Sequence, residues 1–200
     1  VPVFIITVKR GGILIGAFDE RGRMAGFAYS IVGMKDGAPS QWSHMMGVVP
    51  EYRRSGLGRT LKLAQRERAL AAGFSLMEWT FDPLQALNAH LNFAKLGVVC
   101  DEYVRNLYGE STSVLHKGTP TDRLVAQWWI ARPHVERRVA PGGSIPVTSN
   151  EVAEAAPVNT TRPAHAWLAN ADVYLARDER RLVLEIPMGF TDMQREVPAM

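Results

Sequence analysis

The stretch Val48-Val49-Pro50-Glu51-Tyr52-Arg53-Arg54-Ser55-Gly56-Leu57-Gly58-Arg59-Thr60-Leu61 joins a predicted strand to a predicted helix. The strand, residues 42–49, carries no charged side chain unless His44 is protonated. Two glycines, Gly56 and Gly58, follow a pair of arginines at the junction. Glycine lets backbone N–H groups approach a ligand closely, and the unpaired N–H groups of a helix start attract anions. The stretch therefore predicts a phosphate-binding loop, with an ordinary tight strand-to-helix turn as the alternative.

The helix that follows, predicted to reach about Gly73, has an apolar face. Its apolar residues recur at helical spacing, at Leu57, Leu61, Ala64 and Ala71. On the other side lie Lys62, Gln65 and Arg66, which are predicted to face solvent.

The glycine spacing excludes two common phosphate loops. A dinucleotide-binding G-x-G-x-x-G motif would need glycine where Leu61 stands, and a Walker A loop would need an additional upstream glycine. The stretch instead resembles the R/Q-x-x-G-x-G/A signature of the GNAT acyl-CoA N-acyltransferase superfamily, including its V-x-P-E-Y-R lead-in. The resemblance covers roughly residues 10–131. It implies that the pyrophosphate of coenzyme A is held by Arg53, Arg54, Ser55, Gly56, Leu57, Gly58 and Arg59.

The resemblance implies an α/β fold with a mixed, largely antiparallel sheet flanked by helices. Residues 3–8 could form a strand or a short buried helix, and the helix is favoured because Gly11-Gly12 forms a stop signal. Turn and periodicity signals predict a hairpin of strands 13–18 and 24–32, then a loop over 33–40. Further predicted elements are strands at 42–49, 75–81, 98–107 and 124–131 and a helix at 84–96.

In the GNAT superfamily, a strand and one or two helices precede this hairpin. Only about twelve residues do so here, so we expect a GNAT core that lacks its first strand and helices, over residues 1–131. Residues 132–200 are predicted to be a C-terminal extension, forming a small lobe or a dimer arm. Within it we expect a loop region, an extended segment at 149–163, a strand at 181–187 and a helix at 190–197.

Composition favours a cytoplasmic protein without membrane or nucleic-acid partners. No run of about 18 apolar residues is present, and no basic-then-apolar leader opens the chain. The single Cys100 excludes an internal disulfide and fits a reducing compartment. The formal net charge is only +3, and no histidine, cysteine or acid cluster reaches metal-ligand spacing.

One branch of the superfamily stands closer than the rest. The segments at 80–84, 88–92, 95–97, 108–109 and 121–123 resemble predicted bacterial GNAT proteins, some of which are linked with N-acylamino-acid racemases. That resemblance implies succinyl-CoA or acetyl-CoA as the acyl donor and an amino acid as one class of acceptor.

The resemblance also implies roles around the thioester. Backbone N–H groups near Met46, Gly47 and Val48 would meet its carbonyl, and Asn88 or Asn92 would contact the pantetheine or the carbonyl. The usual acid, a helix tyrosine, is replaced by Phe93. Tyr103, Tyr108 or water remain as alternatives.

For the general base, His44 is the first candidate, because imidazole can accept a proton at neutral pH. Glu78 and Asp82 are the alternatives, although Asp82 also suits a helix cap and His44 also suits a structural role in the sheet. The resemblance, taken with these residues, implies transfer of an acetyl or succinyl group from coenzyme A to the amine of a small molecule, such as an amino acid, by direct attack. A non-catalytic acyl-CoA sensor is the alternative function.

Overall fold

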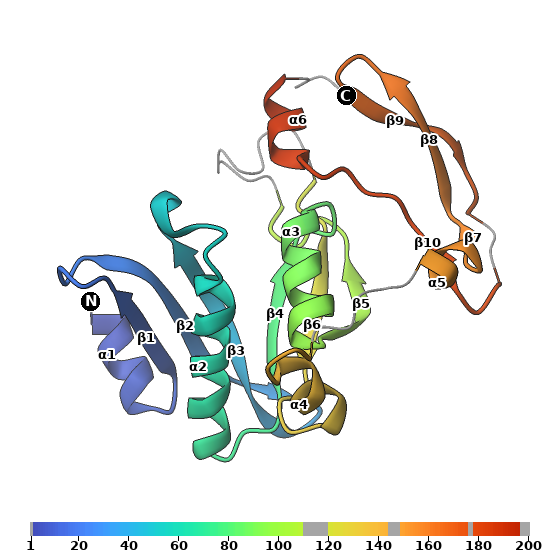
Figure 1. Cartoon of the computed structure of the whole chain (residues 1–200). Helices are drawn as coiled ribbons and strands as arrows, with labels where there is room; N and C mark the ends of the chain where they lie inside the picture. The colour runs from blue at the N-terminus through green and yellow to red at the C-terminus, as the bar shows by residue number, and fades with distance from the viewer. Residues whose placement is uncertain (1, 110–119, 144–148, 176–177, 197–200) are drawn as a thin grey trace.

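The computed structural model describes residues 2–109, 120–143, 149–175 and 178–196, and its centre is a six-stranded sheet (Figure 1). The strand order is β1-β2-β3-β4-β6-β5, and β3 with β4 is the parallel pair while the other neighbours run antiparallel. This confirms the predicted mixed, largely antiparallel sheet. The strands are β1 (Ile13–Phe18), β2 (Met24–Lys35), β3 (Ala38–Val48), β4 (Met77–Phe81), β5 (Val99–Val104) and β6 (Arg123–Trp128).

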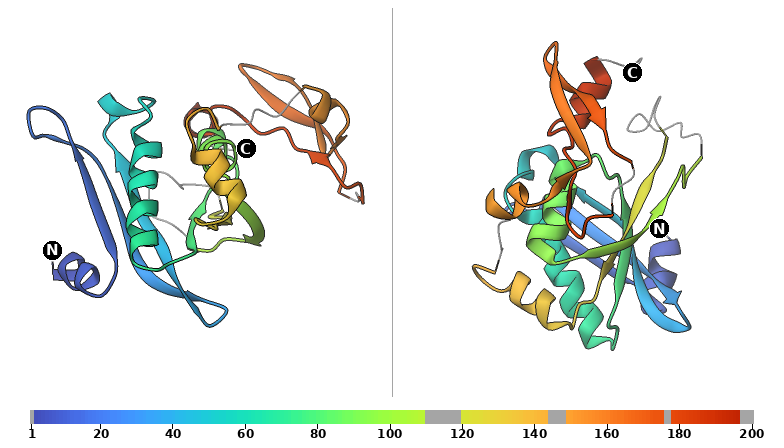
Figure 2. Two further views of the ribbon diagram at one scale, coloured as in Figure 1. Left: turned by 60° about the horizontal axis from the view of Figure 1, so that its bottom comes forward. Right: turned by 90° about the vertical axis from the view of Figure 1, so that its right-hand side faces the viewer.

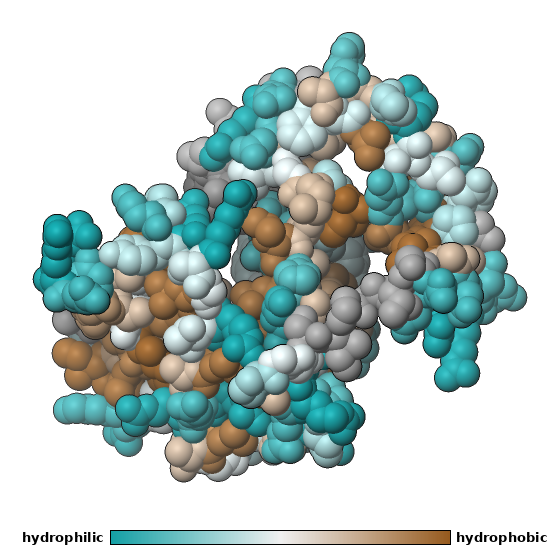
Figure 3. Space-filling model, in the orientation of Figure 1, coloured by the Kyte–Doolittle hydropathy of each residue, from teal (hydrophilic) through white to brown (hydrophobic). Residues whose placement is uncertain are grey.

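Helices cover both faces of the sheet (Figure 2). On one face lie α2 (Leu57–Ala71), α3 (Ala86–Ala89), the π-helix η2 (His90–Leu96) and α4 (Pro133–Val139). On the other face lies α1 (Pro2–Lys9), where Phe4 meets Tyr29 of β2 edge to face at 4.8 Å between ring centroids. The predicted helix at 3–8 is therefore confirmed, but the expectation that it is buried is wrong, since none of the residues of α1 is buried. Figure 3 shows hydrophobic surface over α1 and β1. Ile6 of α1 and Phe18 of β1 are among the exposed apolar residues of these elements.

The predicted loop over residues 33–40 is wrong, because β2 and β3 continue to a two-residue turn. Lys35 pairs with Ala38, and Asp36 and Gly37 between them have φ of +50° and +79°. Two positive φ values in sequence form the turn whose twist matches a hairpin, so the glycine marked a turn within a long ribbon.

The prediction that Lys62 and Gln65 face solvent is also wrong. Their side chains are buried, with 3% and 0% exposed, whereas Ala71 of the predicted apolar face is exposed. The reason is the position of α2, which packs across β1, β2 and β3, so that Lys62 reaches both Ser43 of β3 and the Trp79 ring of β4. Its buried arc is therefore wider than a helix on a continuous sheet would require.

The apolar core lies between β4, β6 and the helices on the α2 side. Trp79 meets Trp128 edge to face at 6.0 Å, and the Trp128 indole N–H donates to the Leu96 carbonyl at 2.8 Å. The predicted helix at 84–96 is present as α3 followed by η2, which ends at Gly97 with φ +73°.

Beyond β6 the helix predicted at 190–197 is present over its described residues, and the other elements differ from expectation. The predicted loop region contains α4, which starts with Pro133 after the extended Arg132. The predicted extended segment begins as a helix, and the predicted strand at 181–187 pairs over two residues only. The described elements are α5 (Ser149–Ala153), β7 (Ala156–Pro157), β8 (Asn159–Ala164), β9 (Trp167–Val173), β10 (Leu182–Val183) and α6 (Phe190–Glu196).

Candidate functional site

The site is organised by the divergence of β3 from β4. The two strands pair only at Gln41 with Met77 and at Trp42 with Glu78, and then separate toward the end of β3 (Figure 1). A β-bulge lies at the same level, because Ser43 pairs with Ser30 and Met45 with Tyr29 while His44 has no partner residue. A bulge bends a strand, so the sequence bends β3 away from β4 just where their pairing ends.

The diverging edge of β3 presents backbone N–H groups. The N–H of Val49 donates to Ala25 of β2 at 3.0 Å. Successive residues of a strand alternate in direction, so the N–H groups of Met46 and Val48 point to the opposite edge, where no described strand pairs with them. Gly47 faces β2. Of the three residues predicted to meet the thioester carbonyl, Met46 and Val48 therefore keep backbone N–H groups that no described strand uses.

The loop before α2 has the geometry of an anion site. Arg54 and Gly56 have φ of +63° and +88°, and Gly56 is the residue that precedes the helix. The first N–H groups of a helix have no intrahelical acceptor. The Ser55 hydroxyl donates to the Tyr52 carbonyl at 2.7 Å and accepts from the Leu57 N–H at 3.4 Å, which holds the turn in place.

Space is also left beside the loop. A side chain at Gly56 would meet nothing within 4 Å, and one at Gly58 would touch Met46 and Leu91 only at 3.9 and 4.0 Å. These two positions therefore leave the backbone open to a ligand that approaches between β3 and η2.

The three arginines near the loop have different contacts. The Nε of Arg53 donates to the Val48 carbonyl at 3.2 Å, and Arg54 is exposed. The guanidinium of Arg59 donates to the Val139 carbonyl at 2.6 Å, so this side chain ties α2 to the end of α4.

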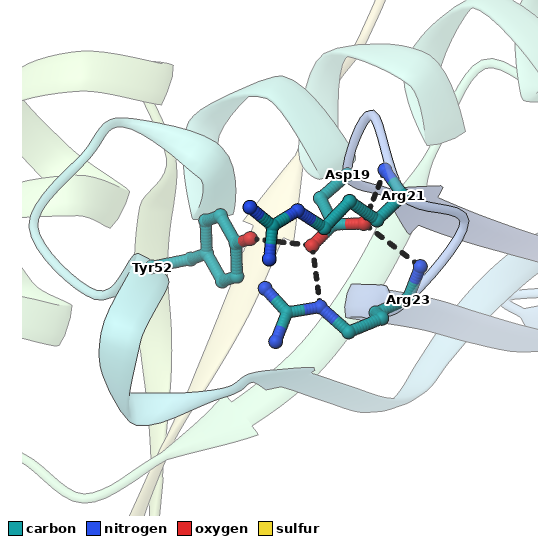
Figure 4. A network of polar contacts seen from close by, with 4 residues as sticks. All are labelled: Asp19, Arg21, Arg23 and Tyr52. Carbon is teal, nitrogen blue, oxygen red and sulfur yellow. Dashed lines mark hydrogen bonds and ion pairs between the residues drawn. The ribbon is translucent and has the colours of Figure 1, made fainter.

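A network of polar contacts anchors the approach to the loop (Figure 4). The Asp19 carboxylate, in the turn between β1 and β2, accepts the backbone N–H groups of Arg21 and Arg23, the Arg23 Nε–H and the Tyr52 hydroxyl. The pKa of Asp19 is lowered, chiefly by the hydrogen bond from the Arg23 backbone N–H. Tyr52 ends the short helix η1 (Pro50–Tyr52), so the network fixes the β1–β2 turn to the segment before the glycines.

The helix opposite the loop carries the predicted asparagines. Asn92 is buried, with 3% exposed, and Asn88 is exposed. Phe93, which stands where the superfamily signature has tyrosine, lies edge to face on Phe81 at 5.8 Å. This part of the helix is the π-helix η2, a conformation that often occurs at functional sites.

The predicted acid–base candidates are not gathered in one cluster. His44 is exposed and its ring meets Tyr29 at 6.2 Å, on the α1 side of the sheet. Glu78 is 4% exposed and accepts from the Ser40 hydroxyl at 3.1 Å. Asp82 caps the following turn, accepting the Leu84 N–H at 2.9 Å.

The two tyrosines lie beside β6 and its preceding segment. The Tyr108 hydroxyl bonds Thr80 at 2.8 Å, and the Tyr103 hydroxyl donates to Asp122. The hydrogen bond to Asp122 raises the pKa of Tyr103 and lowers that of Asp122.

Sequence reasoning missed a buried polar cluster of Ser43, Lys62 and Gln65, hereafter the apex cluster. The Lys62 Nζ donates to the Ser43 hydroxyl at 2.8 Å, and that hydroxyl donates to Gln65 Oε1 at 3.1 Å. Nζ also lies 3.6 Å from the centroid of the Trp79 ring. Burial lowers the pKa of Lys62 to about 7. No local sequence signal marks this cluster, because the burial of Lys62 depends on its contacts with Ser43 of β3 and Trp79 of β4.

No group of histidine, cysteine or acid residues in the described ranges could hold a metal ion. None of the helices within those ranges is both long and apolar enough to cross a membrane.

No family model and no curated protein matches the sequence. Solved structures do match the fold. The ribosomal-protein-S18-alanine N-acetyltransferase from Escherichia coli has a TM-score of 0.53 and 20% identity, over 66% of this chain and 77% of its own. A GNAT family acetyltransferase from Elizabethkingia anophelis, with acetyl-CoA bound, gives 0.51 and 14% over 64% and 83%. Nourseothricin acetyltransferase gives 0.50 and 19% over 60% and 65%. At these identities the likeness extends to the fold, and the chain has the fold of the GNAT acetyltransferases.

Proposed function

We propose that this protein is an acyltransferase of the GNAT superfamily that uses an acyl-coenzyme A. The observation that carries the proposal is the combination of an anion-binding loop at the start of α2 with the separation of β3 from β4 beneath it. The loop would hold the pyrophosphate, and the free N–H groups of Met46 and Val48 would polarise the thioester carbonyl.

The acyl group in this proposal is acetyl or succinyl, and the acceptor is the amine of a small molecule such as an amino acid. The acceptor would approach from the α1 side, where His44 and Glu78 lie, so that the donor and the acceptor enter from opposite faces. Direct attack needs a neutral amine, and His44 is the proposed base because it is exposed on that side.

Two neighbours have acceptors in their names, a ribosomal protein alanine and nourseothricin, and they differ in size and chemistry. The fold therefore leaves the acceptor open, and a panel must decide it. The purified protein is incubated with acetyl-CoA or succinyl-CoA and the amino acids or small amines, and release of free coenzyme A is measured. Acceptor-dependent release supports the proposal.

A non-catalytic acyl-CoA sensor is the second candidate, because Phe93 supplies no hydroxyl where the superfamily signature has one. Calorimetric titration with acetyl-CoA separates the two functions. Binding without release of coenzyme A across the whole panel would favour the sensor, whereas no binding would contradict both.

A further inference from the structure

The apex cluster lies where the two halves of the sheet separate. Ser43 is the β3 residue directly after the last pair with β4, and Trp79 is the β4 residue directly after that pair. The Lys62 Nζ contacts both, at 2.8 Å from the Ser43 hydroxyl and 3.6 Å from the Trp79 ring centroid. The amine of Lys62 therefore stands at the point of the wedge between the strands.

One extended ligand can span the loop before α2 and the wedge, which is the space between the diverging strands β3 and β4. Lys62 lies four residues after Gly58 on α2, which is about 6 Å along a helix axis. A ligand whose pyrophosphate sits at the start of α2, and whose arm passes between β3 and β4, would bring its far end toward Lys62.

The apex cluster has more donors than acceptors. Lys62 forms no ion pair with any carboxylate in the part of the chain that the structure describes. The Nε2 of Gln65 is fully buried and has no hydrogen-bond partner among the described residues. Buried donors without acceptors are costly, and a group that carries negative charge would complete this set.

We propose that Lys62 is a catalytic acid, which donates a proton to the sulfur of coenzyme A as the acyl group leaves, with Ser43 and Gln65 as its positioning residues. This rests on the proposed acyl-CoA function. The two tyrosines considered as alternatives are engaged elsewhere, Tyr108 with Thr80 and Tyr103 with Asp122.

The step balances without a further reactant. The acceptor nitrogen forms a bond to the thioester carbon, and the carbon–sulfur bond breaks with its electron pair on sulfur. The ammonium proton of Lys62 moves to sulfur, and the proton that the acceptor loses goes to the base or to solvent. The neutral Lys62 amine regains a proton from solvent after coenzyme A leaves.

The acidity of Lys62 suits this transfer. A thiol has a pKa of about 8.5, and an ordinary lysine, at about 10.4, holds its proton more tightly than a thiolate would. Burial lowers the pKa of Lys62 to about 7, so its ammonium gives up a proton to a thiolate more readily than an ordinary lysine would.

A test that needs no turnover is the titration of bound coenzyme A in its free thiol form, followed by thiolate absorbance. Wild-type protein should lower the pKa of the bound thiol by about one unit or more, because a thiolate and the Lys62 ammonium stabilise each other and titrate as a coupled pair. Lys62→Met and Lys62→Gln should abolish the shift, and Lys95→Met should retain it. Cys100, the single cysteine, does not interfere, because burial raises its pKa to about 11.

The kinetic test uses the same variants. Lys62→Met should lower kcat by about 10²-fold or more, and the fall of kcat as pH rises through neutrality should disappear. A bound thiol with the same pKa in wild type and Lys62→Gln overturns the assignment of Lys62, even if acyl transfer is observed. Failure of coenzyme A to bind wild-type protein at all overturns the proposed function instead.

Discussion

A lysine amine without a carboxylate partner is an expensive group to bury, and Lys62 has no such partner among the residues that the structure describes. Its hydrogen bond to Ser43 and the face of Trp79 offset only part of the lost hydration. Proteins retain strained or poorly compensated groups mainly at functional sites, which is consistent with the position of Lys62 at the wedge.

This cost predicts that Lys62→Met is more stable than wild type at neutral pH, by an amount on the order of 2 kcal/mol. The pKa of Lys62 is lowered on folding, so the unfolded chain binds more protons between about pH 7 and the ordinary lysine value. Wild-type stability is therefore reduced in full below pH 7 and recovers as pH rises. Chemical denaturation at pH 7 and pH 9.5 should show the difference between variant and wild type shrink. An equal difference at both pH values would mean that the amine is not desolvated.

A second residue-scale prediction concerns His44. His44→Ala should lower kcat by about 10²–10⁴-fold, because a general base acts on the acceptor amine, while the affinity for acetyl-CoA stays nearly unchanged. Glu78→Gln and Asp82→Asn are the comparisons on the same scaffold, and the second should mainly destabilise, since Asp82 caps the turn at Leu84. A His44→Ala enzyme with at least half the wild-type rate would place the base elsewhere.

Single residues differed in how well the sequence predicted them. The place of Gly56 in a special loop could be predicted from the sequence, because only a few backbone conformations explain paired glycines at a strand–helix junction. Lys62 was not, because its burial depends on β3 and β4 separating under α2, and no local spacing records that separation. The β-bulge at His44 is hidden for the same reason, since it is a property of the pairing with β2.

At the scale of elements, the glycine before α2 can be compared with the glycine after it, since only the first lies at the proposed pyrophosphate site. Gly56 and Gly73 have φ of +88° and +83°, and a side chain at either would meet nothing within 4 Å. Alanine at each position therefore costs a similar amount, about 1 kcal/mol, from backbone strain alone. Gly56→Ala should also weaken coenzyme A by about tenfold, which is about 1.4 kcal/mol, while Gly73→Ala should not.

Calorimetric titration of coenzyme A into the two variants provides the measurement, and thermal unfolding checks that their stabilities match. Equal affinities of the Gly56 and Gly73 variants would mean that the loop before α2 does not hold the pyrophosphate.

Elements with strong periodicity or sharp ends were predicted correctly, including the first hairpin, α2 and β4. The errors have local causes. The loop expected over residues 33–40 is a tight turn inside a ribbon, and its glycine signal carried no information on the length of the flanking strands. The strands beyond residue 150 are short or exposed, so they lack the alternating apolar pattern by which strands are recognised.

At the scale of the whole molecule, the C-terminal region is joined to the core by few described contacts. Thr191 of α6 and Gln85, just before α3, exchange hydrogen bonds at 3.1 and 3.4 Å. The small sheets β8–β9 and β7–β10 stand apart from the six-stranded sheet (Figure 1). A region with so little shared core gains stability from further contacts of its own apolar surface.

That surface leads to the last prediction, that the protein forms a homodimer through its C-terminal region. Leu175 is 89% exposed and Met188 is 80% exposed, and exposed apolar side chains of this size favour association. Sedimentation at increasing concentration should show a dimer for wild type, and Leu175→Ser with Met188→Ser should shift it toward monomer. Ile6→Ser, which removes an equally apolar side chain from the opposite edge at α1, is the control and should leave the equilibrium unchanged. A dimer that Ile6→Ser disrupts and the C-terminal changes do not would place the interface at α1. A wild-type protein that stays monomeric at every concentration would show that the C-terminal region is not a dimer arm.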